Sequence, residues 1–352
     1  MCHDRKTGFV IGVCGALILS GCTHLGLKPN RAENSKLTIH FQNMVALEIS
    51  PAGCSVLHYG GLERLCDYQS NTPSDLMFQI GPGLSRLMAN TDPIDAAHTA
   101  HRRSLLWREW ARQGVRFYTV DARDLEPSLE ALEALAKDTA IVRLSTNIKT
   151  KDGTRHLFEP YYTVAWGKKQ IVFLGFSEPA VTTHDNWQVT DIGAAFTQMA
   201  QRLESQTDLL VVTGSLSPAT RARLATLSTR PLLFLGGELS EPNTLQLQSL
   251  SPTAAFAKAP DLGRGIGAIE LSESPATGSA IRLGDLTGDF RPTVFRKSTI
   301  QSPRCQELAR TISDTLGGPN SCSAIEDLSD CPKDCGSELC HRIALPSPDR
   351  FR

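Results

Sequence analysis

Beyond residue 20 the sequence contains no apolar run as long as the ~20 residues that a transmembrane helix needs, and its charges are nearly balanced. Lys and Arg number 36, Asp and Glu number 37, and the formal net charge is -1 at pH 7. A nucleic-acid-binding domain needs a clustered basic face, so no nucleic-acid partner is expected. The Gly-x-Ser-x-Gly elbow of serine hydrolases and a P-loop leading into a helix are also absent.

The N-terminus has the features of a bacterial lipoprotein signal. Arg5 and Lys6 precede an apolar stretch at residues 9–20, and Leu19-Ser20-Gly21-Cys22 resembles the lipobox at which such signals are cleaved. The resemblance implies that Cys22 becomes the first residue and is acylated, with palmitate or a similar chain. Several acyl chains hold a protein on a bilayer far more firmly than one. The alternative is an ordinary cleaved secretion signal.

This reading divides the N-terminal part of the chain into two segments. We expect a signal peptide at residues 1–21 and a flexible tether at residues 22–36. Thr23, in place of Asp after the cysteine, resembles the pattern of lipoproteins sent to the outer membrane. The expected partner is therefore the lipid bilayer, and the expected location is the cell envelope, with the domain in the periplasm or at the surface.

Of the ten cysteines, two fall in the signal peptide and one at the acylation site. Disulfides persist outside the cytoplasm, so the other seven are disulfide candidates, and an odd number leaves at least one thiol without an intrachain partner. Two lie close together in sequence, which favours a bridge between them, and five lie near the C-terminus. The candidates are Cys54, Cys66, Cys305, Cys322, Cys331, Cys335 and Cys340.

The C-terminal segment, residues 301–352, is polar and rich in cysteine, and we expect it to be an appendage. Cys335, Cys340 and His341 resemble a c-type haem attachment motif with four intervening residues in place of two. Disulfide pairing is the simpler use of these thiols, so no cofactor is expected, and a haem-binding tail remains an alternative.

Between residues 37 and 300 the pattern predicts a layered α/β domain with mixed sheets. Short apolar runs typical of buried strands alternate with helical periodicity. The expected strands lie at residues 45–49, 76–80, 115–120, 141–144, 171–174, 209–212, 232–235, 266–271 and 280–286. The expected helices lie at residues 96–113, 125–137, 192–205, 218–227 and 306–316. A hairpin is expected at Gly167-Lys168.

Several short motifs resemble the 5'-nucleotidase-type metallophosphoesterases, which have the calcineurin-like fold. They are Gly60-Gly61-Leu62-Glu63-Arg64, Leu144-Ser145-Thr146-Asn147-Ile148 and Phe158-Glu159-Pro160-Tyr161, the last followed by the predicted hairpin. Each is weak alone, but their order and spacing match. The resemblance implies an α/β/β/α sandwich and a centre of two divalent metals about 3.5–4 Å apart.

The ligands for such a centre are missing from the matching positions. The family's Asp-x-His after the first strand falls on residues 45–50, where Glu48 is the only acid. Gly-Asp after the second strand has become Gly81-Pro82, and the histidines after the later strands are replaced by Thr213-Gly214-Ser215 and Gly236-Gly237-Glu238. We therefore expect no two-metal site.

The third conserved segment of the family, Gly-Asn-His-Asp, has become Val120-Asp121-Ala122-Arg123-Asp124. Arg123, at the place of the catalytic histidine, adds a fixed positive charge that opposes a metal and could bind a small anion. Four acids could in principle hold one hard cation: Glu48, Asp121, Asp124 and Glu238. Asp124 precedes a predicted helix, however, and is expected to be its N-cap.

Together these expectations describe an envelope lipoprotein with a metallophosphoesterase-like fold that is a non-catalytic binding or assembly module. Its ligand would be an envelope protein or a small anion. The alternatives are a phosphoesterase with a rebuilt metal site and an envelope redox protein with a haem-binding tail.

Overall fold

The computed structural model describes residues 36–49, 60–85, 93–125, 128–178, 184–244, 246–272, 291–294 and 300–315. The predicted signal peptide, the predicted tether up to residue 35, Cys22, Cys54, the predicted strand at residues 280–286 and the tail beyond residue 315 lie outside them, whereas Lys36, the last residue of the predicted tether, begins β1. So do Cys322, Cys331, Cys335, Cys340 and His341. In the described ranges no helix is both long enough and apolar enough to pass through a bilayer.

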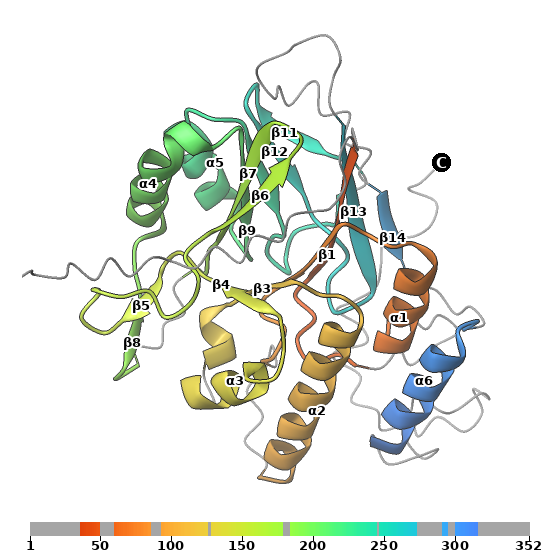
Figure 1. The fold of residues 1–352 in the computed structure, drawn as a ribbon. Helices are drawn as coiled ribbons and strands as arrows, with labels where there is room; N and C mark the ends of the chain where they lie inside the picture. The colour runs from red at the N-terminus through yellow and green to blue at the C-terminus, as the bar shows by residue number, and fades with distance from the viewer. Residues whose placement is uncertain are drawn as a thin grey trace, which may run out of the picture. The chain divides into compact units, whose positions relative to one another are not determined.

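Two six-stranded sheets form the centre of the domain (Figure 1). The first has the order β14 (Arg291–Val294), β13 (Gly265–Ser272), β1 (Lys36–Asn43), β2 (Leu76–Ile80), β3 (Phe117–Thr119) and β4 (Val142–Leu144). Its strands β1 to β4 run parallel, and β13 is antiparallel to both of its neighbours. The sheet is therefore mixed.

The second sheet has the order β11 (Gln248–Ser251), β12 (Ala254–Ala257), β10 (Leu232–Leu235), β9 (Leu209–Thr213), β7 (Lys169–Gly175) and β6 (Tyr162–Trp166). The predicted runs at residues 209–212 and 232–235 are parallel central strands, and every residue of β9 and β10 is buried. Continuous apolar runs suit strands that are covered on both faces. The hairpin predicted at Gly167-Lys168 joins β6 to β7. A small sheet pairs β5 (Ile148–Thr150) with β8 (Trp187–Val189).

Helices cover the outer face of each sheet, so the domain is an α/β/β/α sandwich, as predicted (Figure 1). The first sheet carries α1 (Leu62–Asn71), α2 (Pro93–Arg112), α3 (Leu129–Ala136) and α6 (Pro303–Thr315). The second carries α4 (Ile192–Leu203) and α5 (Pro218–Leu227). Between the sheets lies an apolar core in which Phe78 stacks on Phe117 and Phe173.

Helices α3, α4 and α5 begin where a side chain accepts from a free backbone N–H group of the first turn. Ser217 caps α5 and is followed by Pro218 at the first helical position, so the predicted range 218–227 is confirmed. The predicted helix at residues 125–137 begins later, at Leu129, because Ser128 is its cap and accepts from the N–H of Ala131 at 3.1 Å. The prediction that Asp124 is the N-cap of this helix is wrong, since Asp124 lies in a short 3₁₀ turn, Ala122–Leu125.

The first strand differs from the prediction. Residues 45–49 are apolar and buried except for Glu48, but Met44, Ala46 and Leu47 have φ values of 45°, 51° and 63°, in the left-handed region. Three such residues turn the chain and exclude an extended strand. The strand instead lies at Lys36–Asn43, where polar side chains are interspersed with apolar ones.

A disulfide joins Cys66 of α1 to Cys305 of α6, with the Cα atoms 5.7 Å apart and a sequence separation of 239. The bridge favoured by sequence proximity, between Cys54 and Cys66, is therefore incorrect. Leu308 and Ile312 of α6 are buried in the core over the first sheet. The packed core thus extends past residue 300, into the segment expected to be an appendage.

Candidate functional site

The strand ends at which the family resemblance implies metal ligands come from both sheets and lie close together. At the end of β3, the Thr119 hydroxyl lies 2.7 Å from the hydroxyl of Thr213, the last residue of β9. At the end of β1, the Asn43 amide donates to the carbonyl of Gly237, after β10, at 3.1 Å. The architecture therefore brings the expected positions together, and the chemistry depends on the side chains there.

The first of these positions is displaced from its predicted place. The first strand ends at Asn43, so the segment at its end is Asn43-Met44-Val45. The Asp-x-His position therefore no longer falls on residues 45–50. Glu48 lies instead in the turn after the strand, where its N–H donates to the carbonyl of Val45 at 3.0 Å. Asn43 is completely buried and is the polar residue at the end of β1.

Asp124 is buried at the end of β3 and is surrounded by donors. Its Oδ1 accepts from the N–H groups of Gly83 and Leu84, at 3.2 and 2.9 Å, and from the Ser85 hydroxyl at 3.3 Å. Its Oδ2 accepts from the Tyr118 hydroxyl at 2.5 Å and from the N–H of Asp121 at 3.1 Å. Burial, with the charge of Asp121, raises the pKa of Asp124 to about 6.

Asp121, three residues before Asp124, is occupied by its neighbour Arg123. The guanidinium contacts both carboxylate oxygens, Nε to Oδ1 at 2.7 Å and NH2 to Oδ2 at 3.2 Å, and the Arg123 N–H also donates to Oδ1. The Arg123 side chain is 34% exposed and the Asp121 side chain 5%. The arginine expected to bind an anion is therefore engaged by an anion of the chain itself.

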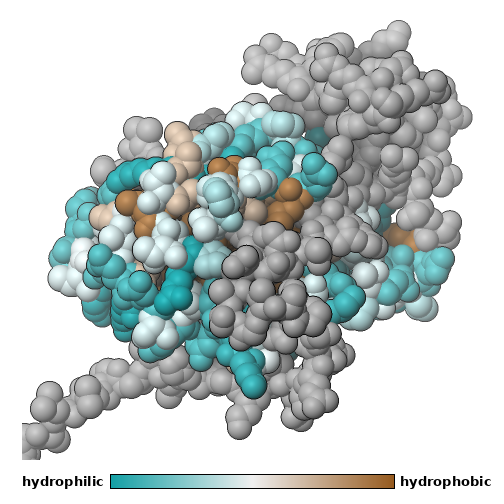
Figure 2. Space-filling view, turned by 90° about the horizontal axis from the view of Figure 1, so that it is seen from above, coloured by the Kyte–Doolittle hydropathy of each residue, from teal (hydrophilic) through white to brown (hydrophobic). Residues whose placement is uncertain are grey.

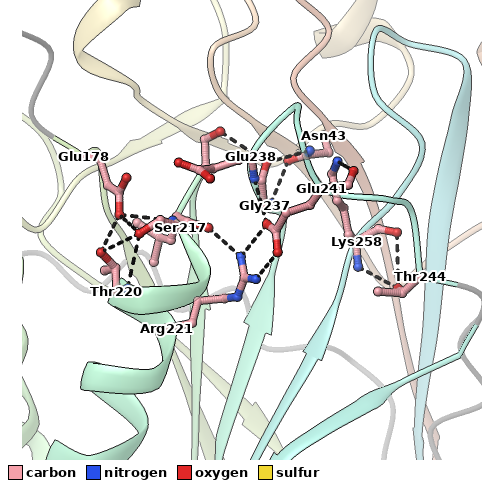
Figure 3. Close-up of polar contacts among 12 residues, drawn as sticks. Asn43, Glu178, Ser217, Thr220, Arg221, Gly237, Glu238, Glu241, Thr244 and Lys258 are labelled. Carbon is pink, nitrogen blue, oxygen red and sulfur yellow. Dashed lines mark hydrogen bonds and ion pairs between the residues drawn. The ribbon is translucent and has the colours of Figure 1, made fainter. Parts of the chain in front are cut away.

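In the half of the domain built on the second sheet, an ion pair with little exposure, between Arg221 and Glu241, holds the loop after β10. The Arg221 guanidinium of α5 contacts both oxygens of Glu241, and its NH1 also donates to the carbonyl of Leu216 (Figure 3). The N–H of Glu238 donates to Glu241 at 3.1 Å. Arg221 further lies over the ring of Phe256, 3.8 Å from its centroid.

A second ion pair lies directly after β12. The Lys258 ammonium, whose side chain is 0% exposed, contacts Oδ2 of Asp261 at 2.6 Å and the carbonyl of Glu241 at 2.6 Å. The other oxygen of Asp261 accepts from the Asn43 amide at 2.5 Å. Burial raises the pKa of Asp261 to about 6, and Lys258 opposes the increase. The carboxylate is thus ionised at neutral pH and paired with a buried cation.

Glycines let the strand ends approach one another very closely. A Cβ at Gly236, whose φ is 95°, would lie 2.8 Å from the carbonyl oxygen of Gly214 and 2.9 Å from Oδ1 of Asn43. At Gly81 a Cβ would meet Asp124 Oδ2 at 2.8 Å. Side chains at these two places would collide with existing atoms. The strand ends are therefore packed too closely at these two positions for any residue other than glycine.

The donor set does not fit a pair of metal ions. Among the described residues, no three His, Cys, Asp or Glu side chains are grouped as metal ligands would be. The candidate acids Glu48, Asp121, Asp124 and Glu238 accordingly form no common centre. Asp121 binds a guanidinium and Asp124 five neutral donors. A two-metal centre requires several free oxygen and imidazole ligands around each ion, and these strand ends do not offer them.

The residues that dominate the site were not singled out by sequence reasoning. They are Asn43, Arg221, Glu241, Lys258 and Asp261. One signal was present: Lys258 interrupts the otherwise apolar run at residues 254–259, which is an unusual place for a charge without a partner.

No protein-family model matches the sequence, and no curated protein matches it. Solved structures with the same fold do exist. The 5'-nucleotidase precursor of Thermus thermophilus superposes with a TM-score of 0.59 at 14% identity, covering 79% of this chain and 58% of its own. A sulfate thiohydrolase from the same organism gives a TM-score of 0.62 at 11% identity, covering 82% and 61%. This chain thus spans about three fifths of the length of these two enzymes.

A shorter neighbour is covered almost completely. The calcineurin-like phosphoesterase of Bacillus subtilis has a TM-score of 0.57 at 14% identity, with 80% of this chain and 96% of that one aligned. Identities this low establish architecture and leave activity open. The described part of the chain therefore has the fold of the 5'-nucleotidase-type, calcineurin-like metallophosphoesterases.

Proposed function

We propose that the protein is a non-catalytic binding or assembly module of the bacterial envelope, built on a metallophosphoesterase fold. One observation carries the proposal: the buried carboxylates at the strand ends are already bound by groups of the same chain. Asp124 has five donors, Asp121 has Arg123, and Asp261 has Lys258. Hydrolysis in this fold needs such carboxylates to hold metal ions instead.

Membrane attachment is the second part of the proposal. Cys22 would carry the acyl chains, and the tether at residues 22–36 would separate the domain from the bilayer. The disulfide between Cys66 and Cys305 supports a location outside the reducing cytoplasm. An outer-membrane position follows only from the resemblance at Thr23.

The ligand is proposed to be another envelope protein. The small-anion alternative loses support because Arg123 is paired with Asp121. An open groove of about 510 Å³ between α4 and α5, lined partly by Thr197, Gln198 and Leu227, offers a mixed surface for a partner. Figure 2 shows apolar patches scattered among hydrophilic residues on the face drawn. A contact with such a surface would combine apolar and polar groups, as transient interfaces do.

Hydrolysis by the purified mature chain tests the absence of catalysis. We expect no turnover of nucleoside monophosphates or generic phosphate esters with Mn²⁺ above that of the Asp121→Ala variant. Turnover that a chelator abolishes, and that Asp121→Ala also removes, would establish the phosphoesterase alternative and end this proposal.

Fractionation of cells expressing the full chain tests the attachment. The protein should be found with the envelope membranes, and the Cys22→Ala variant should be released in soluble form or retain its signal peptide. Mass spectrometry of the mature N-terminus should show the acyl groups. An unacylated Cys22 would contradict this part of the proposal alone.

A further inference from the structure

The loop at residues 236–241, directly after β10, is held from both sheets by groups of the chain itself. From the first sheet, Asn43 donates to the carbonyl of Gly237 at 3.1 Å and accepts from its N–H at 3.4 Å. From the second, Lys258 donates to the carbonyl of Glu241 at 2.6 Å, and Arg221 binds the Glu241 carboxylate. In the family this loop carries a metal-binding histidine, so its position here is set by different chemistry.

The charges around this loop are buried and balanced. The side chains of Lys258 and Arg221 are 0% and 4% exposed, and those of Asp261 and Glu241 are 11% and 15% exposed. Two cations therefore face two carboxylates in a region with little water. A buried charge is tolerated only when it is paired and hydrogen-bonded. A divalent ion would add two positive charges to a neutral set and would have to displace Lys258 or Arg221.

The Lys258 ammonium also links the two sheets. It contacts Asp261 Oδ2, and Asp261 Oδ1 accepts from Asn43 at the end of β1. Lys258 follows β12, in the other sheet. Figure 3 shows Asn43 and Lys258, which come from the two sheets, beside Gly237 and Glu241 of the loop. The Lys258 ammonium thus contacts the carbonyl oxygen of Glu241 and the carboxylate of Asp261, and through Asp261 it connects the ends of β12 and β1.

We propose that the Lys258 ammonium is an internal replacement for a metal ion, joining strand ends that metal ions join in a bimetallic phosphoesterase. Arg221 supplies the second positive charge at the same loop. The proposal goes beyond the absence of catalysis, because it states what holds the site together and makes the folded domain independent of metal. It can fail even if the protein hydrolyses nothing.

Thermal unfolding of the mature chain with Lys258→Met provides the first test. The substitution keeps the length of the side chain and removes its charge, so Asp261 loses the cation that it contacts. Tm should fall by roughly 5–10 °C. Lys137→Met, at the exposed end of α3, is the matched control and should change Tm by less than about 1 °C. Equal effects of the two substitutions would overturn the proposal.

The response to metal provides the second test. Neither EDTA nor 1 mM Mn²⁺ should move the Tm of the unmodified chain by more than about 1 °C, and a clear drop in EDTA would show a structural metal and overturn the proposal. With Asn43→Asp added to Lys258→Met, a carboxylate replaces the amide that faces Asp261 and the ammonium is removed, so two carboxylates lie together without Lys258. Mn²⁺ should then raise Tm by at least ~2 °C.

Asn43→Asp alone, which keeps Lys258, is the control and should not respond to Mn²⁺. If the double variant folds and ignores Mn²⁺, the ammonium does not occupy a cation position and the proposal is wrong. If the double variant does not fold, Lys258→Met and the chelator experiment on the unmodified chain still decide it.

Discussion

The strand ends of the two sheets bury a carboxylate in two different ways. Asp124, after the first sheet's β3, accepts five hydrogen bonds from neutral groups, three of them backbone N–H groups. Asp261, after the second sheet's β12, contacts one ammonium and one amide. Burial raises both pKa values to about 6. The same electrostatic cost is therefore offset by many weak donors in one place and by a single cation in the other.

The difference predicts which substitutions destabilise each region most. Asp124 accepts from five neutral donors, so the loss of one donor leaves four hydrogen bonds. Each of these bonds contributes only about 1 kcal/mol. Where one cation is the principal partner, its removal leaves a buried charge unpaired, which costs about 3–5 kcal/mol. The stability of the first sheet's strand ends should therefore depend on the Asp124 carboxylate, and that of the second sheet's strand ends on the cations Lys258 and Arg221.

The largest effect is expected when the shared acceptor is removed. Asp124→Ala leaves three buried N–H groups and two hydroxyls without their acceptor, so the free energy of unfolding should fall by about 4 kcal/mol or more. Urea unfolding followed by circular dichroism measures it, with the exposed Asp138→Ala as control. A loss below about 1 kcal/mol would show that these donors find other acceptors and that the two regions do not differ as described.

A single cation should matter nearly as much on the other side. Arg221→Met leaves Glu241 without its guanidinium and removes the contact with Phe256, so the free energy of unfolding should fall by about 3 kcal/mol. Adding Glu241→Gln, which removes the unpaired charge, should restore part of the loss. Additive losses in the double variant would show that the pair is not coupled.

The layers of the fold followed from the sequence because burial on both faces leaves a clear pattern. The runs at residues 209–212 and 232–235 contain only apolar residues or nearly so, and both are central strands. In α5, Ser217 and Pro218 mark the start of the helix as well as its cap. These signals come from residues that are close in sequence, so they can be interpreted without knowing the tertiary contacts.

The site was less predictable because its contacts are not local. Asn43 and Asp261 are 218 residues apart in sequence, and Cys66 and Cys305 are 239 apart. Spacing alone does not determine cysteine connectivity. The first strand was missed since residues 45–49 look more like a strand than residues 36–43 do, and only the left-handed turns at Met44, Ala46 and Leu47 reverse that preference. The residue types at the positions that match the family's motifs could be read from the sequence, and the contacts that these residues make could not.

Glu63, in the first turn of α1, sharpens the comparison as a buried carboxyl with fewer donors. Its side chain is 4% exposed, its Oε2 has no partner among the described residues, and burial raises its pKa to about 7. A pKa above the unfolded value stabilises the fold below about pH 4.5, and this contribution is lost as pH rises through 7. Glu63 should therefore account for a fall of roughly 2–3 kcal/mol in the free energy of unfolding between pH 5 and 8, in addition to the smaller falls from Asp124 and Asp261.

Glu63→Gln, which does not titrate, should remove the share of Glu63 from that fall, whereas the exposed Glu133→Gln should leave the fall unchanged. Urea titrations at five or six pH values measure the difference. If the free energy of unfolding falls with pH as steeply in Glu63→Gln as in the unmodified chain, the fall is due to other buried carboxyls, such as Asp124 and Asp261.

The smallest effect is expected two residues along α5 from Arg221. Arg223 also pairs with a carboxylate, Asp191 at 3.1 Å, but these side chains are 57% and 55% exposed. Water and salt screen such a pair, so Arg223→Gln should lower the free energy of unfolding by no more than about 0.5 kcal/mol. The two substitutions remove the same charge from the same helix. A cost for Arg223 comparable to that of Arg221 would mean that burial does not explain why the cations at the second sheet's strand ends matter.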